Sequence, residues 1–470
     1  MIKDQEYHLL DLITGKYLYD RNTDGIIKVP DDVYMYLNGE ISNNKYVDDY
    51  INYLKKNGLL LSELIGEGSH PLTDMLDYYL KNKMTHIILQ VTQECNLRCE
   101  YCVYSDNYIT RIHNTRKMSF ETAKKAIDLL IKNSRDSERV SFSFYGGEPL
   151  LEFNLIKDCV KYAKEKGEGR NISFRFTTNG TLLTKEKLPF LVDNNFTLLI
   201  SLDGPYDIHN IHRKFANDNK GSFEKIYENL KLLKELYPQF YKENISFNTV
   251  LDPNNSFDYI KNYFDHDPMY KNNTFSFSTI SEDYSKNNIY YSPQFIEEER
   301  YMIFLTYLNK LRHFRKNSFK SKFTEPFFAN IKEVFDNINS EEKGFSIKKG
   351  HRGGPCIPGR IRAFVSVDGN IFLCEKISET SEAGKIGNVN TGLDKKKVRQ
   401  LLNIESNTKE LCKNCWAYHR CNICAVKADD GTNISVEVIK ASCIKMKKEV
   451  DSILKDYCVL KYLGIEKENF

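Results

Sequence analysis

The stretch Cys95-Asn-Leu-Arg-Cys99-Glu-Tyr-Cys102 follows an apolar run at residues 86–92 and spaces three thiols as CxxxCxxC. Three thiolates can hold three corners of a [4Fe-4S] cubane and leave the fourth iron open to a small molecule. A structural zinc site instead needs four ligands in a closed tetrahedron, and no fourth cysteine or histidine is adjacent in the sequence. The motif therefore predicts an open iron–sulfur cluster, with zinc as the alternative.

Apolar strand-like runs alternate with amphipathic helical runs from residue 86 to about residue 280, a range that includes this loop. Strands are predicted at residues 86–92, 140–145, 172–178, 197–202, 245–251 and 274–279. Helical segments lie near residues 120–132, 154–164, 185–193, 222–235 and 257–264. This alternation indicates an α/β fold with a parallel sheet, and six units predict a partial (β/α)6 barrel over residues 86–285. Sites in such folds lie at the C-terminal ends of the strands, where the cysteine loop begins.

The cysteines fall into two groups. Ten of the twelve lie at residues 95–102 and 356–443, and only Cys159 and Cys458 stand alone. The second group reads Cys356-x12-Gly369-x4-Cys374, then Cys412-x2-Cys415-x5-Cys421-x2-Cys424, and finally Cys443. Grouped thiols in a chain without a signal peptide indicate metal or cluster ligands, whereas a disulfide framework is disfavoured. Clusters could also order residues 349–470, which look too poor in apolar residues to hold themselves by packing alone; a pair of zinc ribbons is the alternative.

The composition is that of an ordinary globular protein, with 41% hydrophobic and 28% charged residues. Lysine plus arginine total 67 against 64 for aspartate plus glutamate, so a net charge of +3 gives no reason to expect nucleic acid or a membrane surface as partner. The N-terminus lacks the apolar core of a signal peptide, and no run approaches the roughly 18 apolar residues of a membrane span. We expect a cytoplasmic protein.

Residues 1–70 are predicted to form a small winged-helix-like module. Strand-like stretches at residues 7–13 and 16–19 flank a Thr14-Gly15 turn, two helices follow at about 30–37 and 44–56, and residues 59–61 resemble a short strand. Acidic side chains in its first half would repel a phosphate backbone, which argues against DNA binding: Asp4, Glu6, Asp11, Asp20, Asp24, Asp31 and Asp32. A linker at residues 71–85 with a helix near 71–81 leads to the barrel, and helices near 294–316 and 325–337 form a bridge over residues 286–348.

The three-cysteine loop and the later run Tyr145-Gly146-Gly147-Glu148-Pro149 together resemble the radical S-adenosylmethionine (SAM) superfamily. The resemblance implies that the open iron chelates the amino and carboxylate groups of SAM. Reduction then cleaves SAM to methionine and a 5'-deoxyadenosyl radical that abstracts a hydrogen atom. An electron donor such as flavodoxin or ferredoxin would supply the electron.

The same resemblance implies a set of cofactor contacts. Tyr101 matches the aromatic position near the adenine, and the glycines Gly146 and Gly147 let backbone approach the ligand. Glu148 would accept a hydrogen bond from the SAM ammonium. Three further contacts, weaker as matches, are Asn179 at the end of the third strand, Ser201 on the ribose or carboxylate, and Arg213 pairing the carboxylate. Asn-Gly and Asp-Gly are common turn formers, so ordinary turns remain the alternative for Asn179 and Asp203.

The second cysteine group resembles the SPASM extension of radical SAM enzymes, whose seven cysteines bind two auxiliary [4Fe-4S] clusters and bring the total to three. The chain departs from that pattern by having two residues, not three, between its fifth and sixth cysteines. The resemblance implies one cluster on Cys412, Cys415, Cys421 and Cys443, and another on Cys356, Cys374 and Cys424. One iron then lacks a protein cysteine, because residues 357–363 contain none. A substrate cysteine could coordinate there; Cys159, Cys458, another residue type or water are the alternatives.

Taken together, the three regions resemble SPASM-type maturases of ribosomally made peptides. In these, an N-terminal module binds the leader of the precursor peptide as an added strand. The resemblance implies an enzyme that installs a crosslink, foremost a thioether from a cysteine sulfur to a carbon, as in sactipeptides and ranthipeptides. The alternatives are an anaerobic sulfatase maturase that makes formylglycine, a carbon–carbon crosslinking or epimerising enzyme, and a non-catalytic metal-binding peptide adaptor. No residue is assigned as catalytic acid or base.

Overall fold

The computed structural model describes residues 6–61, 68–310, 321–323, 331–336, 338 and 356–465. The predicted bridge helix at 294–316 corresponds to α11 (Pro293–Lys310), with its last residues outside the described ranges. Most of the second predicted bridge helix, at 325–337, also lies outside them.

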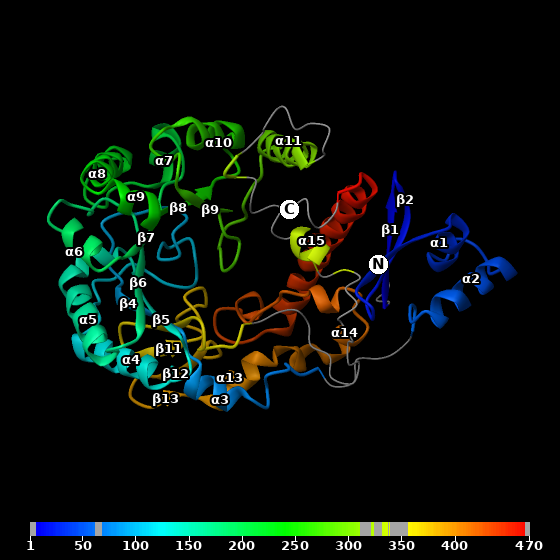
Figure 1. Ribbon diagram of the computed structural model, residues 1–470, viewed down its shortest axis with the longest axis horizontal. Coiled ribbons are helices and arrows are strands. Elements are labelled where there is room, and N and C mark those ends of the chain that lie inside the picture. The colour runs from blue at the N-terminus through cyan, green and yellow to red at the C-terminus, as the bar shows by residue number, and fades with distance from the viewer. Residues whose placement is uncertain are drawn as a thin grey trace.

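The fold is organised around a sheet of ten strands in the order β13-β12-β11-β10-β4-β5-β6-β7-β8-β9 (Figure 1). Six of them are parallel neighbours: β4 (His86–Thr92), β5 (Arg139–Gly146), β6 (Asn171–Thr178), β7 (Thr197–Ser201), β8 (Ile245–Leu251) and β9 (Thr274–Thr279). Between these strands the chain forms α4 (Phe120–Lys132), α5 (Phe153–Lys166), α6 (Leu188–Asp193), α7 (Tyr206–His212), α8 (Phe223–Leu236), α9 (Pro238–Asn244) and α10 (Phe257–His266). This arrangement confirms the predicted α/β partial barrel.

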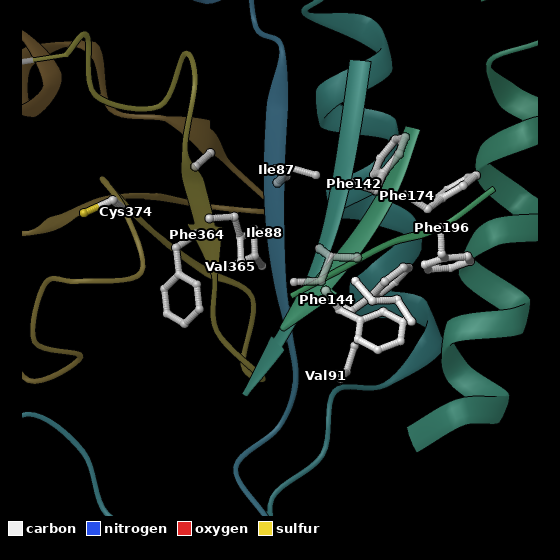
Figure 2. Close-up of a cluster of buried hydrophobic side chains, with 14 of the residues drawn as sticks. Ile87, Ile88, Val91, Phe142, Phe144, Phe174, Phe196, Phe364, Val365 and Cys374 are labelled. Atoms are coloured by element: carbon white, nitrogen blue, oxygen red, sulfur yellow. The ribbon is translucent and has the colours of Figure 1, made fainter. Parts of the chain in front are cut away.

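The two faces of the barrel sheet differ in chemistry. Outward-facing aromatic side chains such as Phe142 and Phe174 are buried beneath the helices, as Figure 2 shows. The residues that alternate with them, including Ser141, Ser173 and Arg175, point to the other face because successive strand residues point to opposite sides. Parallel sheets usually bury apolar residues on both faces, whereas Ser173 and Arg175 are exposed. The inside of the partial barrel is therefore polar and open.

The C-terminal segment continues the barrel sheet. β10 (Ala363–Val365) pairs in parallel with β4, with Ala363 opposite Ile87. The strands β11 (Asn370–Phe372), β12 (Lys385–Asn388) and β13 (Gly392–Leu393) follow as antiparallel neighbours. Phe364 and Val365 lie beside β4 in Figure 2 and belong to the same buried core as the barrel. Apolar residues of this segment are thus packed into the core of the barrel.

The N-terminal residues form a three-stranded antiparallel sheet and two helices. The elements are β1 (Tyr7–Leu12), β2 (Gly15–Asp20), β3 (Gly25–Val29), α1 (Asp31–Leu37) and α2 (Lys45–Lys56). The predicted strand at residues 59–61 is wrong, since Leu60 has a φ of 55°, outside the extended region. The third strand of the sheet is β3 instead.

The N-terminal sheet lies between two layers. Leu18 and Val29 pack on one face against the first helix, whereas Leu10 and Tyr19 pack on the other against Trp416 and the long C-terminal helix. That helix is α15 (Val436–Tyr462), which Figure 1 shows beside β1. Three further helices are α3 (Leu76–Asn82), α13 (Lys395–Leu402) and α14 (Lys409–Lys413). In the described ranges no helix has both the length and the apolar character needed to cross a membrane.

Candidate active site

The three thiols of the first group lie on the loop that follows β4, and each sulfur has a nitrogen donor nearby. The backbone amide of Leu97 donates to Cys95 Sγ at 3.4 Å, and the amide of Tyr104 donates to Cys102 Sγ at 3.5 Å. Nη1 of Arg213 lies 3.9 Å from Cys99 Sγ. Burial raises the pKa of the Cys99 thiol to about 12, because it disfavours the charged thiolate. The nitrogen donors would stabilise the negative charge of the sulfurs when these bind a cluster. The donor set fits three thiolates on an anionic cluster.

Across the described residues, no three histidine, cysteine, aspartate or glutamate side chains gather closely enough to hold one metal ion. A cubane separates its thiolates more widely than a single ion does, because each thiolate binds a different iron.

Gly146 and Gly147 pack directly against the cysteine loop. A Cβ on Gly147 would meet the carbonyl oxygen of Glu94 at 2.1 Å and Cβ of Cys95 at 2.9 Å, and one on Gly146 would meet the carbonyl oxygen of Thr92 at 1.9 Å. The amide of Gly147 donates to that Thr92 oxygen at 3.1 Å. The glycines therefore let the turn after β5 dock on the loop that carries the cysteines, and the approach of backbone to a ligand remains a prediction.

Glu148 is fully buried and connects the ends of two strands. Oε1 accepts hydrogen bonds from Leu150 N at 3.0 Å and Thr178 Oγ1 at 2.7 Å, and Oε2 accepts one from Asn179 N at 2.8 Å. Burial raises the pKa of Glu148, while these donors lower it. A carboxylate has about four acceptor positions, so room for one more donor is left. One free acceptor position is enough for the predicted hydrogen bond from the SAM ammonium.

Asn179 is more than a turn residue. Its Nδ2 donates to Asn96 Oδ1 at 2.9 Å and lies 3.9 Å from Cys95 Sγ. Its Oδ1 accepts from the Thr181 amide at 3.0 Å. The side chain thus joins the end of β6 to the cysteine loop. Ser201, also predicted as a cofactor contact, is buried at the C-terminal end of the neighbouring strand β7.

The buried carboxylate of Asp203 gathers residues that are distant in the sequence. Oδ2 accepts hydrogen bonds from the Tyr101 hydroxyl and from Arg213 Nε, the latter at 2.8 Å, and Oδ1 accepts from Val250 N at 3.1 Å. The guanidinium of Arg213 also lies over the Tyr101 ring, 5.4 Å from its centre. The sequence predicts that Arg213 pairs the SAM carboxylate; in the structure it is paired with Asp203 and adjoins Cys99. The Asp-Gly-Pro sequence conceals the role of Asp203 because it is typical of a turn.

Two sets of thiols are apparent in the second cysteine group. Burial raises the pKa of Cys374 to about 12, and nearby Cys424 raises it further; the pKa of Cys356 is raised by burial and likewise by Cys424. Burial raises the pKa of Cys415 to about 12 in the same way, with Cys421 and Cys412 as its neighbours. The partition of ligands expected from the SPASM resemblance stays a prediction. Of the remaining cysteines, Cys443 is partly buried beside Cys415 and Cys421, and Cys159 and Cys458 are buried in apolar cores.

Tyr145 adjoins the C-terminal segment. Its ring centre lies 5.9 Å from that of Phe364 on β10. Burial raises the pKa of its hydroxyl to about 12; the charge of Arg111 lowers this pKa, and those of Glu375 and Cys102 raise it.

A buried polar network reinforces this connection. Nε2 of Gln90, on β4, donates to Glu379 Oε1 at 2.6 Å and to the Tyr104 hydroxyl at 2.8 Å. Glu379 also forms an ion pair with Arg111, which follows the cysteine loop. Sequence reasoning missed Gln90, Arg111 and Glu379, because they lie on three segments that only the fold brings together.

Residues 89–266 match the model of the Radical SAM superfamily. The cysteine loop, the Gly146–Glu148 turn and the ends of β6 and β7 all lie inside this range, so the chain contains a radical SAM domain. A domain of this class implies one [4Fe-4S] cluster and SAM as cofactors.

The relatives of the chain include enzymes whose names give different reactions. It is 29% identical over 359 residues to a cysteine-type anaerobic sulfatase-maturating enzyme of Clostridium novyi, which covers 72% of this chain and 86% of the relative. It is 27% identical over 235 residues to the radical SAM cyclopropyl synthase TigE of Paramaledivibacter caminithermalis, covering 47% of each. Two other curated relatives are matched over only 46% and 34% of their own length. The solved structure of anSMEcpe with bound AdoMet and Kp18Cys peptide superposes with a TM-score of 0.58 at 19% identity, over 82% of this chain and 99% of the other, which shows a shared fold.

Proposed function

We propose that the protein is a radical SAM peptide maturase that joins a cysteine sulfur of a ribosomally made precursor peptide to a carbon of the same peptide. The observation that carries the proposal is the Glu379 carboxylate, five residues after Cys374, which binds Gln90 on β4 and Arg111 after the cysteine loop. These contacts hold the segment after Cys374 against the segment that follows the first cysteine group. An enzyme that joins sulfur to carbon needs two centres, one for each reacting atom.

Some residues of the chain would bind the cluster and SAM, and others would hold these binding residues in position. Cys95, Cys99 and Cys102 would hold the first cluster, and together with SAM it would supply a 5'-deoxyadenosyl radical. Glu148 would accept the SAM ammonium, and Tyr101 would lie along the adenine. Asn179 and Ser201 would contact SAM from the ends of β6 and β7, and Gly146 and Gly147 hold the turn that carries Glu148 against the cysteine loop.

The second cysteine group would hold two auxiliary clusters. Cys412, Cys415, Cys421 and Cys443 would ligate one of them, and Cys356, Cys374 and Cys424 would ligate the other. The peptide thiol would complete the second set, since soft sulfur ligands suit iron–sulfur sites. In the overall reaction a carbon–hydrogen and a sulfur–hydrogen bond would break and a carbon–sulfur bond would form. One hydrogen would leave on 5'-deoxyadenosine and the other as a proton, and an auxiliary cluster would supply the acceptor for the remaining electron.

The experiment is mass spectrometry of a cysteine-containing precursor peptide encoded near this protein, after anaerobic incubation with reconstituted enzyme, SAM and a reductant such as reduced flavodoxin or ferredoxin. Loss of two hydrogens together with a thiol that no longer reacts with iodoacetamide is the expected result. A peptide that keeps its mass and its reactive thiol while SAM is cleaved would contradict the proposal. Iron content checks the cofactors independently, because three cubanes require about twelve iron atoms per chain.

A second candidate function is formylglycine formation, which the alignment with the sulfatase-maturating enzyme over 86% of that relative favours. The two activities differ in the fate of sulfur. Formylglycine formation removes the sulfur and leaves an aldehyde, which a hydrazide reagent labels, whereas a thioether keeps the sulfur and does not react. The same peptide sample therefore distinguishes the two functions.

The N-terminal residues would bind the leader of the precursor peptide. β1 and β3 are the two outer strands of their sheet, and an outer strand has backbone groups to which an extended peptide can add. The face of that sheet that carries Leu10 and Tyr19 belongs to the same buried cluster as Cys415 and Cys421. A leader bound here would be held next to the domain that carries the auxiliary clusters.

A further inference from the structure

A cleft of about 720 Å³ lies at the N-terminal ends of the barrel strands, at the opposite end of these strands from the cysteine loop. It reaches the inner face of the sheet through Ser141, Ser173 and Arg175, and Arg360 and Ile361 border it from the C-terminal segment. None of these residues belongs to the candidate active site described above.

The cleft carries more positive than negative charge. Four cationic side chains line it, Lys83, Arg139, Arg175 and Arg360, against the two carboxylates of Asp136 and Glu138. The carboxylate of Asp136 already accepts a hydrogen bond from the Tyr78 hydroxyl at 2.7 Å.

Arg175 is the cation that faces the interior of the barrel. Its Nε donates to Ser141 Oγ at 3.0 Å, and among the described residues its guanidinium forms no ion pair with a carboxylate. The nearby Arg362 guanidinium forms an ion pair with Glu375, so its charge is already compensated. His86 borders the cleft as a neutral ring, hydrogen-bonded to Ser143 Oγ at 2.7 Å. Arg360 Nε donates to the carbonyl oxygen of Lys83 at 3.3 Å, and its guanidinium lies over the Tyr79 ring. The uncompensated charges of Arg175 and Arg360 favour an anion in the cleft.

Polar side chains on the inner face of β6 lead from this cleft toward the cysteine loop. Ser173 and Arg175 are exposed and Thr177 is partly exposed on that face, whereas Ser141 and Ser143 on the neighbouring β5 are buried. Five strand steps separate Ser141 from Gly146, which is about 17 Å at roughly 3.3 Å per residue. An extended peptide advances by a similar distance per residue, so about five of its residues span the same path.

From this arrangement we propose that the cleft binds a carboxylate side chain of the peptide substrate about five residues from the modified cysteine. The inference rests on the proposed function in that the ligand is a peptide. It adds a charge requirement on the substrate: an acidic residue at that spacing, which Arg175 and Arg360 bind at the far end of the barrel.

Direct binding tests this proposal without turnover. The probe is a fluorescein-labelled peptide with one cysteine and a glutamate about five residues to either side, compared with a twin that has glutamine at both positions. Fluorescence anisotropy with the reconstituted full chain and SAM should show at least about tenfold tighter binding of the glutamate peptide, decreasing as salt is added. Arg175→Gln combined with Arg360→Gln should reduce this preference to less than about twofold, whereas Arg175→Lys should keep most of it.

Lys231→Gln, on the outer helix α8, is the matched charge control and should leave the preference unchanged. SAM binding and thermal unfolding of each variant show whether it is folded. Equal affinity for the two peptides, no binding of either, or displacement by free glutamate at the concentration of the peptide would each overturn the proposal. A charge preference without any peptide modification would instead reject the proposed reaction and leave the site standing.

Discussion

Arg213 donates a hydrogen bond of 2.8 Å from Nε to Asp203, while its Nη1 lies 3.9 Å from the sulfur of Cys99. A buried anion thus holds a buried cation against a predicted cluster ligand. Burial raises the pKa of Asp203, but the charges of Arg213 and His209 and the hydrogen bonds from Arg213 and Tyr101 together hold this pKa below its usual value. The pair therefore stays ionised, and both charges would act on a cluster held by Cys99.

Substitutions of the two partners should shift the redox potential of the first cluster in opposite directions. Asp203→Asn removes a negative charge and should make the potential less negative, because the reduced cluster carries the extra negative charge. Arg213→Gln removes the positive charge and should make it more negative. Titration monitored by electron paramagnetic resonance measures both, and Asp128→Asn on the exposed side of α4 is the control. Each variant should also lose roughly 3–5 kcal/mol of stability, since a buried charge loses its partner; equal shifts of one sign would contradict the electrostatic account.

Gly147→Ala should prevent assembly of the first cluster. The new Cβ would lie 2.1 Å from the carbonyl oxygen of Glu94, which is backbone and cannot rotate away. The loop with Cys95 would have to shift, so we expect a loss of about four iron atoms per chain and of SAM binding. Gly169→Ala is the control, because its Cβ meets nothing within 4 Å and the φ of 79° costs only about 1 kcal/mol. Full iron content in Gly147→Ala would show that the turn tolerates a side chain.

The partly buried His86 should make the protein less stable in mild acid. Burial, with Arg175 and Arg362 nearby, lowers the pKa of His86 from 6.5 to about 4. Between these values the unfolded chain binds a proton that the folded chain does not, so the free energy of unfolding falls as the pH falls below 6.5. The contribution reaches about 2 kcal/mol at pH 5. Urea unfolding of the wild type and His86→Gln at pH 5 and 7.5 checks this: the variant should lose that much less stability on acidification, and identical losses would contradict it.

Arg420→Gln should loosen the N-terminal sheet. Arg420 donates hydrogen bonds to both carboxylate oxygens of the buried Asp24, at 3.0 and 2.9 Å, and joins the sheet to the segment between Cys415 and Cys421. Loss of these bonds should speed amide hydrogen exchange in β1–β3 by at least about tenfold while exchange in the barrel strands is unchanged. Lys427→Gln, an exposed residue of the same domain, is the control. Exchange that rises equally throughout the chain would indicate general destabilisation rather than undocking.

The parts of the site that the sequence predicts well are those with local chemistry. The spacing of Cys95, Cys99 and Cys102 suits one cluster wherever the loop lies, and the glycines after β5 mark a close approach of backbone. Asp203 is different, because its role depends on Tyr101 and Arg213, which only the folded chain brings to it. A readable signal was the strict alternation of phenylalanine with serine, arginine or threonine at residues 173–177 and 274–278. In a parallel sheet such alternation indicates that one face of the sheet is exposed to solvent.

The strand pairing of the C-terminal segment also has no local signal. β10 has three residues, and its position beside β4 depends on a register, Ala363 opposite Ile87, that no short pattern specifies. Likewise β3 escaped prediction, since Gly25–Val29 is a short run directly before a proline. Both are decided by tertiary packing, which outweighs local propensity in short strands.

The pairing of β10 with β4 has a consequence for the synthesis and folding of the protein on the ribosome. Until residues 363–365 have been synthesised, the backbone edge of β4 is open, although every other strand of the barrel is already present. While the intervening residues are being translated, the nascent barrel exposes an unpaired strand edge with which other chains can pair. Delivery of iron and sulfide to the loop after β4 would then follow completion of the chain, and a version cut off before residue 363 should aggregate rather than persist as a smaller enzyme.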